Sequence, residues 1–305
     1  MKEINGYILF SELKTTNSGF SKWGFAQRNG SRFFIKELID PIYPVCADLL
    51  DSGVVARKRA ICQQFEDRSK LLYHVINECS DGNLVHIEDF FRCDSHYYLV
   101  MEKIDAIGID EVMAIPIEDR VRICKALVHC LGRLHQRGIV HADIKLDNIL
   151  FRRLPSGKVT GKLIDFDNCF WEMQPPQPDE EIHGDLVYMA PETFMMMQTE
   201  TGTIDRAIDV FALGLVFHQI FTGRLPAFDA RAYDYPFEAV LDGATLAVDA
   251  AIPDAWRDLI AQMLKTDPRE RISLEIAEGI LKGGTTVAPP AAETNPFLAP
   301  AGDLL

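Results

Sequence analysis

The sequence has few of the features that mark secreted, zinc-binding or membrane-spanning proteins. Its seven cysteines are scattered without a Cys-x-x-Cys pair, which argues against a disulfide framework and against a structural zinc site. The longest apolar run, 210–221, contains His218 and is shorter than the ~20 residues that span a bilayer. The first residues form no apolar signal region. We therefore expect a soluble cytoplasmic protein without membrane contact.

Basic residues are also scarce. The 305-residue chain has 31 Lys and Arg against 45 Asp and Glu, a formal net charge of −14. A surface that binds nucleic acid needs clustered positive charge, and the only basic triplet, 57–59, is expected on the solvated face of a helix. Nucleic acid is therefore not an expected partner. With 48% hydrophobic residues, the chain can bury one large or two modest cores, which suits a two-lobed enzyme.

One polar stretch carries the groups that phosphoryl transfer needs. Residues 141–148 read His-Ala-Asp-Ile-Lys-Leu-Asp-Asn, and a further aspartate follows in Leu-Ile-Asp-Phe-Asp. In this set Asp143 can orient a hydroxyl group and accept its proton, and Lys145 can neutralise charge on the transferred group. Asn148 and Asp165 carry the oxygen atoms that Mg²⁺ prefers as ligands. The stretch therefore predicts a phosphotransferase.

These motifs resemble those of the protein kinase catalytic core. Residues 141–148 match HRDLKPEN, 165–167 read Asp-Phe-Asp where the family usually has Asp-Phe-Gly, and 184–192 match the segment that ends in Ala-Pro-Glu. Asp-Pro-Arg-Glu-Arg-Ile at 267–272 resembles the family's closing motif. The resemblance covers roughly residues 7–283. The variant Asp-Phe-Asp is also similar to small kinases of bacterial type.

The resemblance implies an α+β, bilobal fold. Residues 1–105 would form an N-lobe of antiparallel strands plus one helix, with the hinge at its end. Residues 106–283 would form a mainly helical C-lobe, and 284–305 a flexible tail rich in Ala and Pro. Within the N-lobe, Asn29-Gly30 between apolar runs predicts a β-hairpin from the residues alone.

The resemblance also implies an ATP site. Lys36, in Phe34-Ile35-Lys36, matches the lysine that holds the α- and β-phosphates. Met101 matches the gatekeeper, and the backbone of the hinge would face the adenine edge. The further residues expected to contact the nucleotide are Ser18, Gly19, Glu102, Ile104 and Leu150.

A helical glutamate is expected to form an ion pair with Lys36. Our choice is Glu66. In the family the residue one turn after this glutamate is apolar, whereas Lys70 follows Glu66 and Leu71 follows Asp67. Asp67 therefore stays open as the alternative.

Three features depart from the family pattern. Ser or Thr stands at every glycine position of the loop 16–23, where glycine normally lets backbone N–H groups approach phosphates. Phe34 replaces a small alanine beside adenine, so its ring must narrow the adenine slot or turn aside. Asp185 replaces a threonine that joins the catalytic Asp and Lys. It could pair with Lys145 but would crowd Asp143 electrostatically.

The segment after Asp165 lacks the residues of a phosphorylation switch. No Ser or Thr occurs between 168 and 187, and Ala142 replaces the arginine that clamps a phosphate in many kinases. From 165 to 192 there are eight acidic residues and no Lys or Arg, so the segment can attract a basic protein substrate.

Several residues are expected to have structural roles. By resemblance, Asp209 hydrogen-bonds the backbone of the catalytic loop, and Arg271 forms an ion pair with Glu192. His141 and Phe166 are expected to pack in the core rather than react.

Together these features predict a Ser/Thr protein kinase that uses ATP and Mg²⁺ and needs no activation-loop phosphorylation. One alternative is a kinase-like scaffold that binds nucleotide without transferring phosphate. The other is a small-molecule phosphotransferase, which normally lacks both a lysine at the position of Lys145 and an Ala-Pro-Glu segment.

Overall fold

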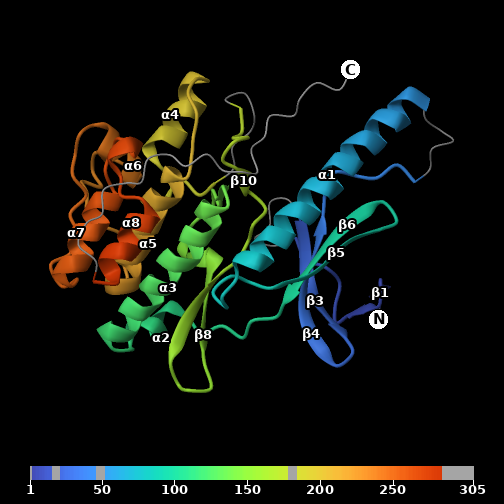
Figure 1. Ribbon diagram of the computed structural model, residues 1–305, viewed down its shortest axis with the longest axis horizontal. Coiled ribbons are helices and arrows are strands. Elements are labelled where there is room, and N and C mark those ends of the chain that lie inside the picture. Colours follow the sequence, from blue (N-terminus) through green and yellow to red (C-terminus); the bar gives the residue numbers. More distant parts are fainter. Residues whose placement is uncertain (1, 16–20, 46–51, 178–183, 284–305) are drawn as a thin grey trace.

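The chain folds into two lobes of different character. The computed structural model describes residues 2–15, 21–45, 52–177 and 184–283. Strands dominate its N-terminal part and helices its C-terminal part (Figure 1). The predicted α+β bilobal fold is confirmed.

An antiparallel sheet forms the body of the N-terminal lobe. In the described residues six strands pair in the order β1-β2-β3-β4-β6-β5. Asn29 and Gly30 have positive φ angles of 52° and 81°, as a two-residue turn between β3 and β4 requires, so the predicted hairpin is confirmed. The strands are β1 (Glu3–Ile4), β2 (Tyr7–Leu9), β3 (Ser21–Arg28), β4 (Ser31–Leu38), β5 (Ile87–Cys93) and β6 (His96–Glu102).

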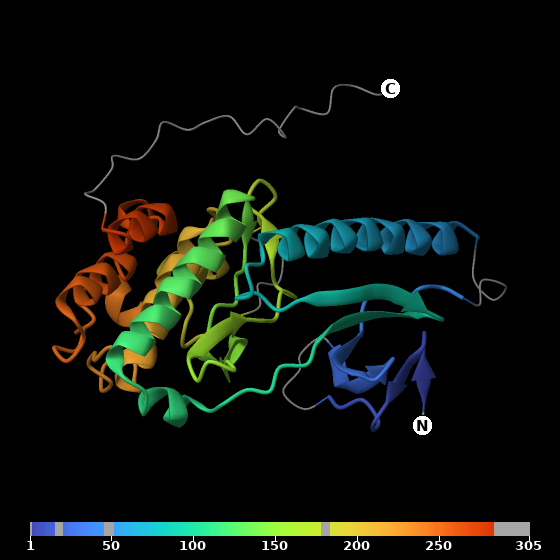
Figure 2. The same cartoon turned by 60° about the horizontal axis from the view of Figure 1, so that its bottom comes forward.

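The two faces of this sheet have different neighbours. Ile35 of β4 is fully buried in a small apolar cluster with Tyr7. Successive strand residues point to opposite faces, so Lys36 points to the other side. The long helix α1 (Ser52–Cys79) runs along this second face (Figure 2). Lys36 therefore lies on the face that α1 covers.

Helices and two short antiparallel strand pairs build the described part of the C-terminal lobe. β8 (Ile149–Arg153) and β9 (Val159–Leu163) form a hairpin, whereas β7 (Ile139–Val140) pairs with β10 (Phe170–Trp171), which follows that hairpin in the chain. Two 3₁₀ turns span Leu146–Asn148 and Pro268–Glu270. The helices are α2 (Ile109–Met113), α3 (Ile117–Gln136), α4 (Pro191–Thr199), α5 (Ala207–Thr222), α6 (Pro236–Leu241), α7 (Asp254–Met263) and α8 (Leu274–Leu281).

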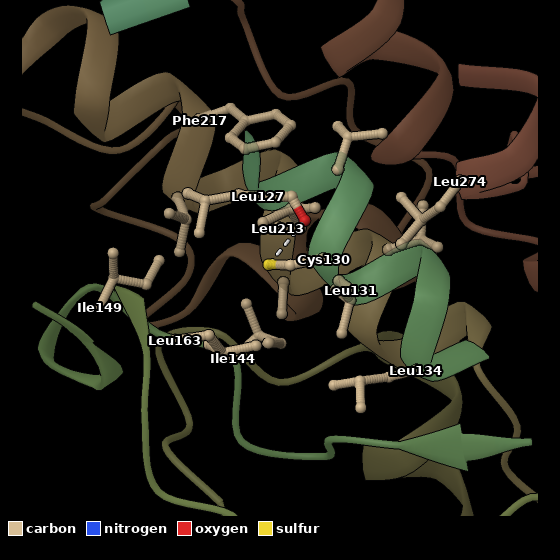
Figure 3. Close-up of a cluster of buried hydrophobic side chains, with 14 of the residues drawn as sticks. Leu127, Cys130, Leu131, Leu134, Ile144, Ile149, Leu163, Leu213, Phe217 and Leu274 are labelled. Carbon is tan, nitrogen blue, oxygen red and sulfur yellow. Dashed lines mark hydrogen bonds between the residues drawn. The ribbon is translucent and has the colours of Figure 1, made fainter. Parts of the chain in front are cut away.

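Helix α5 is the buried centre of this lobe. It is apolar on almost every side, which is stable only when neighbouring elements cover it all round. Figure 3 shows Leu213 and Phe217 of α5 in one cluster with Leu127 and Leu131 of α3. Burial of each such side chain contributes about 1.5–3 kcal/mol. Among the described residues, no helix is both long and apolar enough to cross a membrane.

Candidate active site

One buried carboxylate holds the loop 141–148 in place. Asp209 of α5, which is 1% exposed, accepts hydrogen bonds from the backbone N–H groups of His141 and Ala142, each at 2.8 Å. Ala142 has a φ of 63°, and a left-handed conformation costs a non-glycine residue about 1–2 kcal/mol. The two hydrogen bonds offset this cost. The predicted contact of Asp209 with the catalytic loop is confirmed.

Asp143 is the centre of a polar network within this loop, and it is 9% exposed. The ammonium nitrogen of Lys145 lies 3.1 and 2.9 Å from the two carboxylate oxygens. The amide nitrogen of Asn148 donates to Asp143 Oδ2 and to its backbone oxygen, both at 2.8 Å. A 3₁₀ turn at Leu146–Asn148 brings the amide back to the carboxylate. A carboxylate fixed in this way can orient a hydroxyl group and accept its proton.

Lys36 connects the two lobes across this site. Its side chain is 9% exposed, and Nζ lies 2.8 Å from Asp165 Oδ1 and 2.7 Å from Asp167 Oδ2. Asp165 follows β9, and the preceding residue, Ile164, donates its backbone N–H to the carbonyl oxygen of Asn148 at 2.9 Å. The sheet, the catalytic loop and the Asp-Phe-Asp turn therefore meet at one point.

Burial and charge compete at this triple contact. Burial alone would raise the pKa of Asp165, but the ammonium of Lys36 outweighs it and holds that pKa below its usual range. For Asp167, burial and the neighbouring Asp165 carboxylate outweigh Lys36 and raise the pKa. Burial would lower the pKa of Lys36, but Asp167 and then Asp165 raise it. The lysine is therefore held as an ammonium ion.

The expected ion pair between Lys36 and Glu66 is not formed in the structure. Glu66 Oε1 instead accepts a hydrogen bond from the Tyr97 hydroxyl at 2.9 Å, and Lys70 lies 3.3 Å from Oε2. Asp67, the alternative, faces outward and accepts a hydrogen bond from a glutamine of its own helix. The prediction was wrong because it fixed the spacing along the helix without knowing which turn of α1 faces Lys36.

An aromatic cluster lies on the same sheet face as Lys36. Phe34 stacks on Trp23 of β3, with ring centroids 5.7 Å apart and planes at 22°. Phe25 meets Phe34 edge to face at 5.7 Å. In the sheet Phe34 is paired with Met101, the expected gatekeeper, which is 5% exposed. The ring of Phe34 is therefore packed against β3, which is how it is accommodated at the position of a small residue.

The residues of the hinge and of β8 that are expected to contact the nucleotide lie next to one another. Leu150 of β8 pairs with Lys162 of β9, so both side chains point to the same face of that hairpin. The ammonium of Lys162 is in ion-pair contact with the Glu102 carboxylate at the end of β6. Leu150 thus faces the segment that contains Glu102 and Ile104. Ser18 and Gly19 lie outside the described residues.

The donor set fits a magnesium ion. Asn148 uses its amide nitrogen on Asp143, so its oxygen is the atom available to a metal, and the side chain of Asp165 is 34% exposed. Mg²⁺ usually takes one or two carboxylates together with phosphate oxygens. Within the described ranges no group of three or more His, Cys, Asp or Glu side chains could hold a metal alone. Phosphate oxygens would have to complete the coordination.

A cavity of about 410 Å³ opens beside Asp143, and its lining includes Asp167, Asp185 and Tyr188. Asp185 Oδ1 accepts the backbone N–H of Val187 at 2.9 Å, so this carboxylate is used within its own turn. The described partner of Lys145 is Asp143. The cavity therefore adjoins the carboxylate that would receive an acceptor group.

The predicted ion pair between Arg271 and Glu192 is confirmed. Two guanidinium nitrogens lie 2.5 and 2.8 Å from the two carboxylate oxygens of Glu192, at the start of α4. His141 and Phe166 are buried, and their rings lie 5.1 Å apart, so their predicted packing is confirmed as well.

Comparison with known proteins identifies the family. The sequence profile of the protein kinase domain matches residues 46–282, more than half of the chain. The chain therefore belongs to the protein kinase family. The match begins after β4, so it does not include Lys36, whose place in the site comes from the structure.

Several similar proteins are Ser/Thr kinases by name. The chain is 29% identical to mouse serine/threonine-protein kinase DCLK3 over 66% of its length and 25% of that protein's. It is 28% identical to serine/threonine-protein kinase zyg-8 of Caenorhabditis elegans over 72% of this chain and 28% of that protein. A Xenopus laevis RAC-beta serine/threonine-protein kinase B is 33% identical over 51% and 30% of the two chains. The chain spans about a quarter to a third of these relatives.

Sequence reasoning missed three contacting residues. Asp167 was read only as a replacement for glycine, and Lys162 was not considered. Glu172, which forms an ion pair with Arg206, was only counted among the eight acidic residues of 165–192. Asp167 could have been suspected because it places a carboxylate two residues from the expected metal ligand Asp165. The contact of Lys162 with Glu102 leaves no signal in the sequence.

Proposed function

We propose that this chain is an ATP- and Mg²⁺-dependent Ser/Thr protein kinase. The observation that supports it most directly is the network of Asp143 with Lys145 and Asn148, placed beside Asp165 and Lys36. It contains a proton acceptor, positive charge from both lobes and the oxygen donors for a metal. Lys145 in the loop and the Ala-Pro-Glu segment favour a protein Ser or Thr over a small-molecule acceptor.

In this proposal each side chain has one role. Asp143 orients the acceptor hydroxyl and takes up its proton, while Lys145 and Lys36 stabilise negative charge on the phosphates. Asp165 and Asn148 would hold Mg²⁺, which when bound neutralises phosphate charge. Trp23 and Phe34 supply the apolar surface above the base.

Phosphate transfer from labelled ATP to a Ser- or Thr-containing protein tests the proposal. Asp143→Asn keeps the shape but removes the base, so we expect a rate loss of about 10²–10⁴. Asp147→Asn is the matched control, because Asp147 lies in the same loop, is exposed and is acidic. Equal transfer by wild type and Asp143→Asn would instead support a nucleotide-binding scaffold.

We also propose that the activation segment needs no phosphate. Glu172 forms an ion pair with Arg206 just before α5, with Nε of Arg206 2.5 Å from Oε1. Burial would raise the pKa of Glu172, but Arg206 lowers it, so the carboxylate stays charged. The N–H of Glu172 donates to the carbonyl oxygen of Gly138 at 2.8 Å, beside the pairing of β10 with β7. The Glu172 carboxylate thus fixes the start of the activation segment without a phosphate group.

Phosphatase treatment tests this second proposal. Wild-type activity should be unchanged by treatment, and Glu172→Gln should lower kcat several-fold because the segment loses a charged anchor. A drop in wild-type activity after phosphatase treatment would contradict it.

The acidic surface favours a basic protein substrate. The net charge of −14 and the half-buried Asp185 in the cavity lining support this choice, whereas the acidic run at 179–181 lies outside the described residues. A Ser peptide flanked by Arg should therefore be phosphorylated faster than the same peptide flanked by Asp, and the difference should shrink as salt rises.

A further inference from the structure

Lys36 has two acidic partners, and both come from the same turn. Asp165 and Asp167 approach its ammonium group at 2.8 and 2.7 Å. Asp165 is the expected metal ligand, so its carboxylate has a second task. Asp167 has no assigned task, yet its side chain is 21% exposed and makes the shorter of the two contacts.

Helix α1 presents no carboxylate to Lys36 in the described structure. Its inward positions near the Asp-Phe-Asp turn are Ser69 and Tyr73, which are 6% and 8% exposed. The Tyr73 hydroxyl is hydrogen-bonded to Ser69 and lies close enough to Asp167 to feel its charge. Glu66 lies about one turn further toward the helix N-terminus, where it binds Tyr97. A serine therefore occupies the turn of α1 that faces the site.

The turn that carries Asp167 is held firmly. Asp165 has a φ of 66° and accepts a hydrogen bond from the backbone N–H of Asp167. Phe166 between them is 3% exposed and packs on His141. Its carbonyl oxygen accepts the N–H of Cys169 at 3.3 Å. These contacts fix where the Asp167 carboxylate points.

We propose that Asp167 is the positioning residue of Lys36, the role that was expected of a glutamate on α1. The inference rests on the proposed kinase function. With Asp167 beside it, the ammonium of Lys36 would keep a charged partner when Asp165 serves as a metal ligand. Lys36 is then positioned by the Asp-Phe-Asp turn itself, and its placement does not depend on a charge carried by α1.

Paired substitutions test this assignment through steady-state kinetics. Asp167→Asn should lower kcat/KM for the nucleotide at least about tenfold, because the ammonium of Lys36 loses a charged partner that lies 2.7 Å away. Asp167→Glu should recover part of the loss, since it restores the charge. Glu66→Gln is the matched control on α1 and should stay within about twofold of wild type.

Two readouts that need no phosphate transfer complete the test. At saturating Mg²⁺, Asp167→Asn should bind a fluorescent ATP analogue more weakly than wild type does. In urea unfolding, Asp167→Asn should destabilise the wild-type background more than a Lys36→Met background, because the charge partner is already gone in the latter.

Three outcomes would overturn the inference. One is a loss in Glu66→Gln as large as that in Asp167→Asn. Another is an Asp167→Asn variant that needs more Mg²⁺ but binds and turns over nucleotide normally when Mg²⁺ saturates, which would make Asp167 a metal ligand. The third is strict additivity with Lys36→Met in unfolding. If the wild-type chain transfers no phosphate, the proposed function fails, while the unfolding cycle still decides the role of Asp167.

Discussion

Removal of the guanidinium of Arg271 should destabilise the C-terminal lobe strongly. Its side chain is 1% exposed and makes five hydrogen bonds, two to Glu192 and three to the carbonyl oxygens of Ala207, Lys265 and Thr266. It also lies 5.0 Å from the ring centroid of Phe211. The pair thus ties α4 to α5 and to the segment before α8.

The magnitude follows from what a truncation leaves behind. Arg271→Ala leaves the Glu192 carboxylate, which is 15% exposed, and three carbonyl oxygens without the hydrogen-bond donors of the guanidinium. Loss of one partner of a buried ion pair typically costs about 3–5 kcal/mol. At roughly 2–4 °C per kcal/mol for domains of this size, Tm should fall by about 10 °C.

Arg269 is the matched control. It forms a similar two-point ion pair with Asp267, with contacts of 3.0 and 2.7 Å, but its side chain is 88% exposed. Arg269→Ala should therefore change Tm little, because water replaces the lost contacts. The double variant Arg271→Met with Glu192→Gln should be more stable than the two single losses predict, since no charge is left unpaired. Equal Tm values for Arg271→Ala and Arg269→Ala would refute this reasoning.

Three further predictions address other contacts. Hydrogen bonds to Asp81 and Glu278 raise the pKa of His129. The charged imidazole therefore contributes fully to stability below about pH 6.5, and this contribution is lost as pH rises through the raised pKa. The Tm of wild type should exceed that of His129→Gln by more at about pH 5.5 than at about pH 8.5. Asp209→Ala should lower kcat about 10- to 100-fold, because the loop 141–148 loses the carboxylate that holds its backbone. Steady-state kinetics should show little change in the KM for the nucleotide, because the residues expected to bind it are unaltered. Phe34→Ala should cost about 1–3 kcal/mol in urea unfolding, since the ring is only partly buried but loses two aromatic neighbours; an unchanged midpoint would contradict the packing.

The catalytic loop could be predicted from the sequence because its chemistry depends on short spacings. Asp143, Lys145 and Asn148 lie within six positions of one another, so one turn of backbone brings them together wherever the loop is placed. The hairpin at Asn29-Gly30 was predictable for the same reason, because those residues adopt positive φ at low cost.

The partner of Lys36 could not be predicted in this way. Each helix residue turns the side chain by about 100°, so whether Glu66 or Asp67 faces Lys36 depends on how α1 is rotated and shifted against the sheet. That placement is set by packing contacts such as that of Cys62 with residues of β4 and β6, which lie far away in sequence. The spacing of residues along the helix does not predict how α1 is placed against the sheet.

The sequence by itself determined which chemical groups this protein possesses and in what order they occur: a base, two lysines, two metal-ligand candidates and an anchoring ion pair. The tertiary structure alone decided which of them touch. Lys36 and Asp167 are 131 positions apart, and their contact at 2.7 Å exists only because the two lobes close on each other. Long-range contacts of this kind depend on how separate elements pack, and local sequence patterns do not encode that packing.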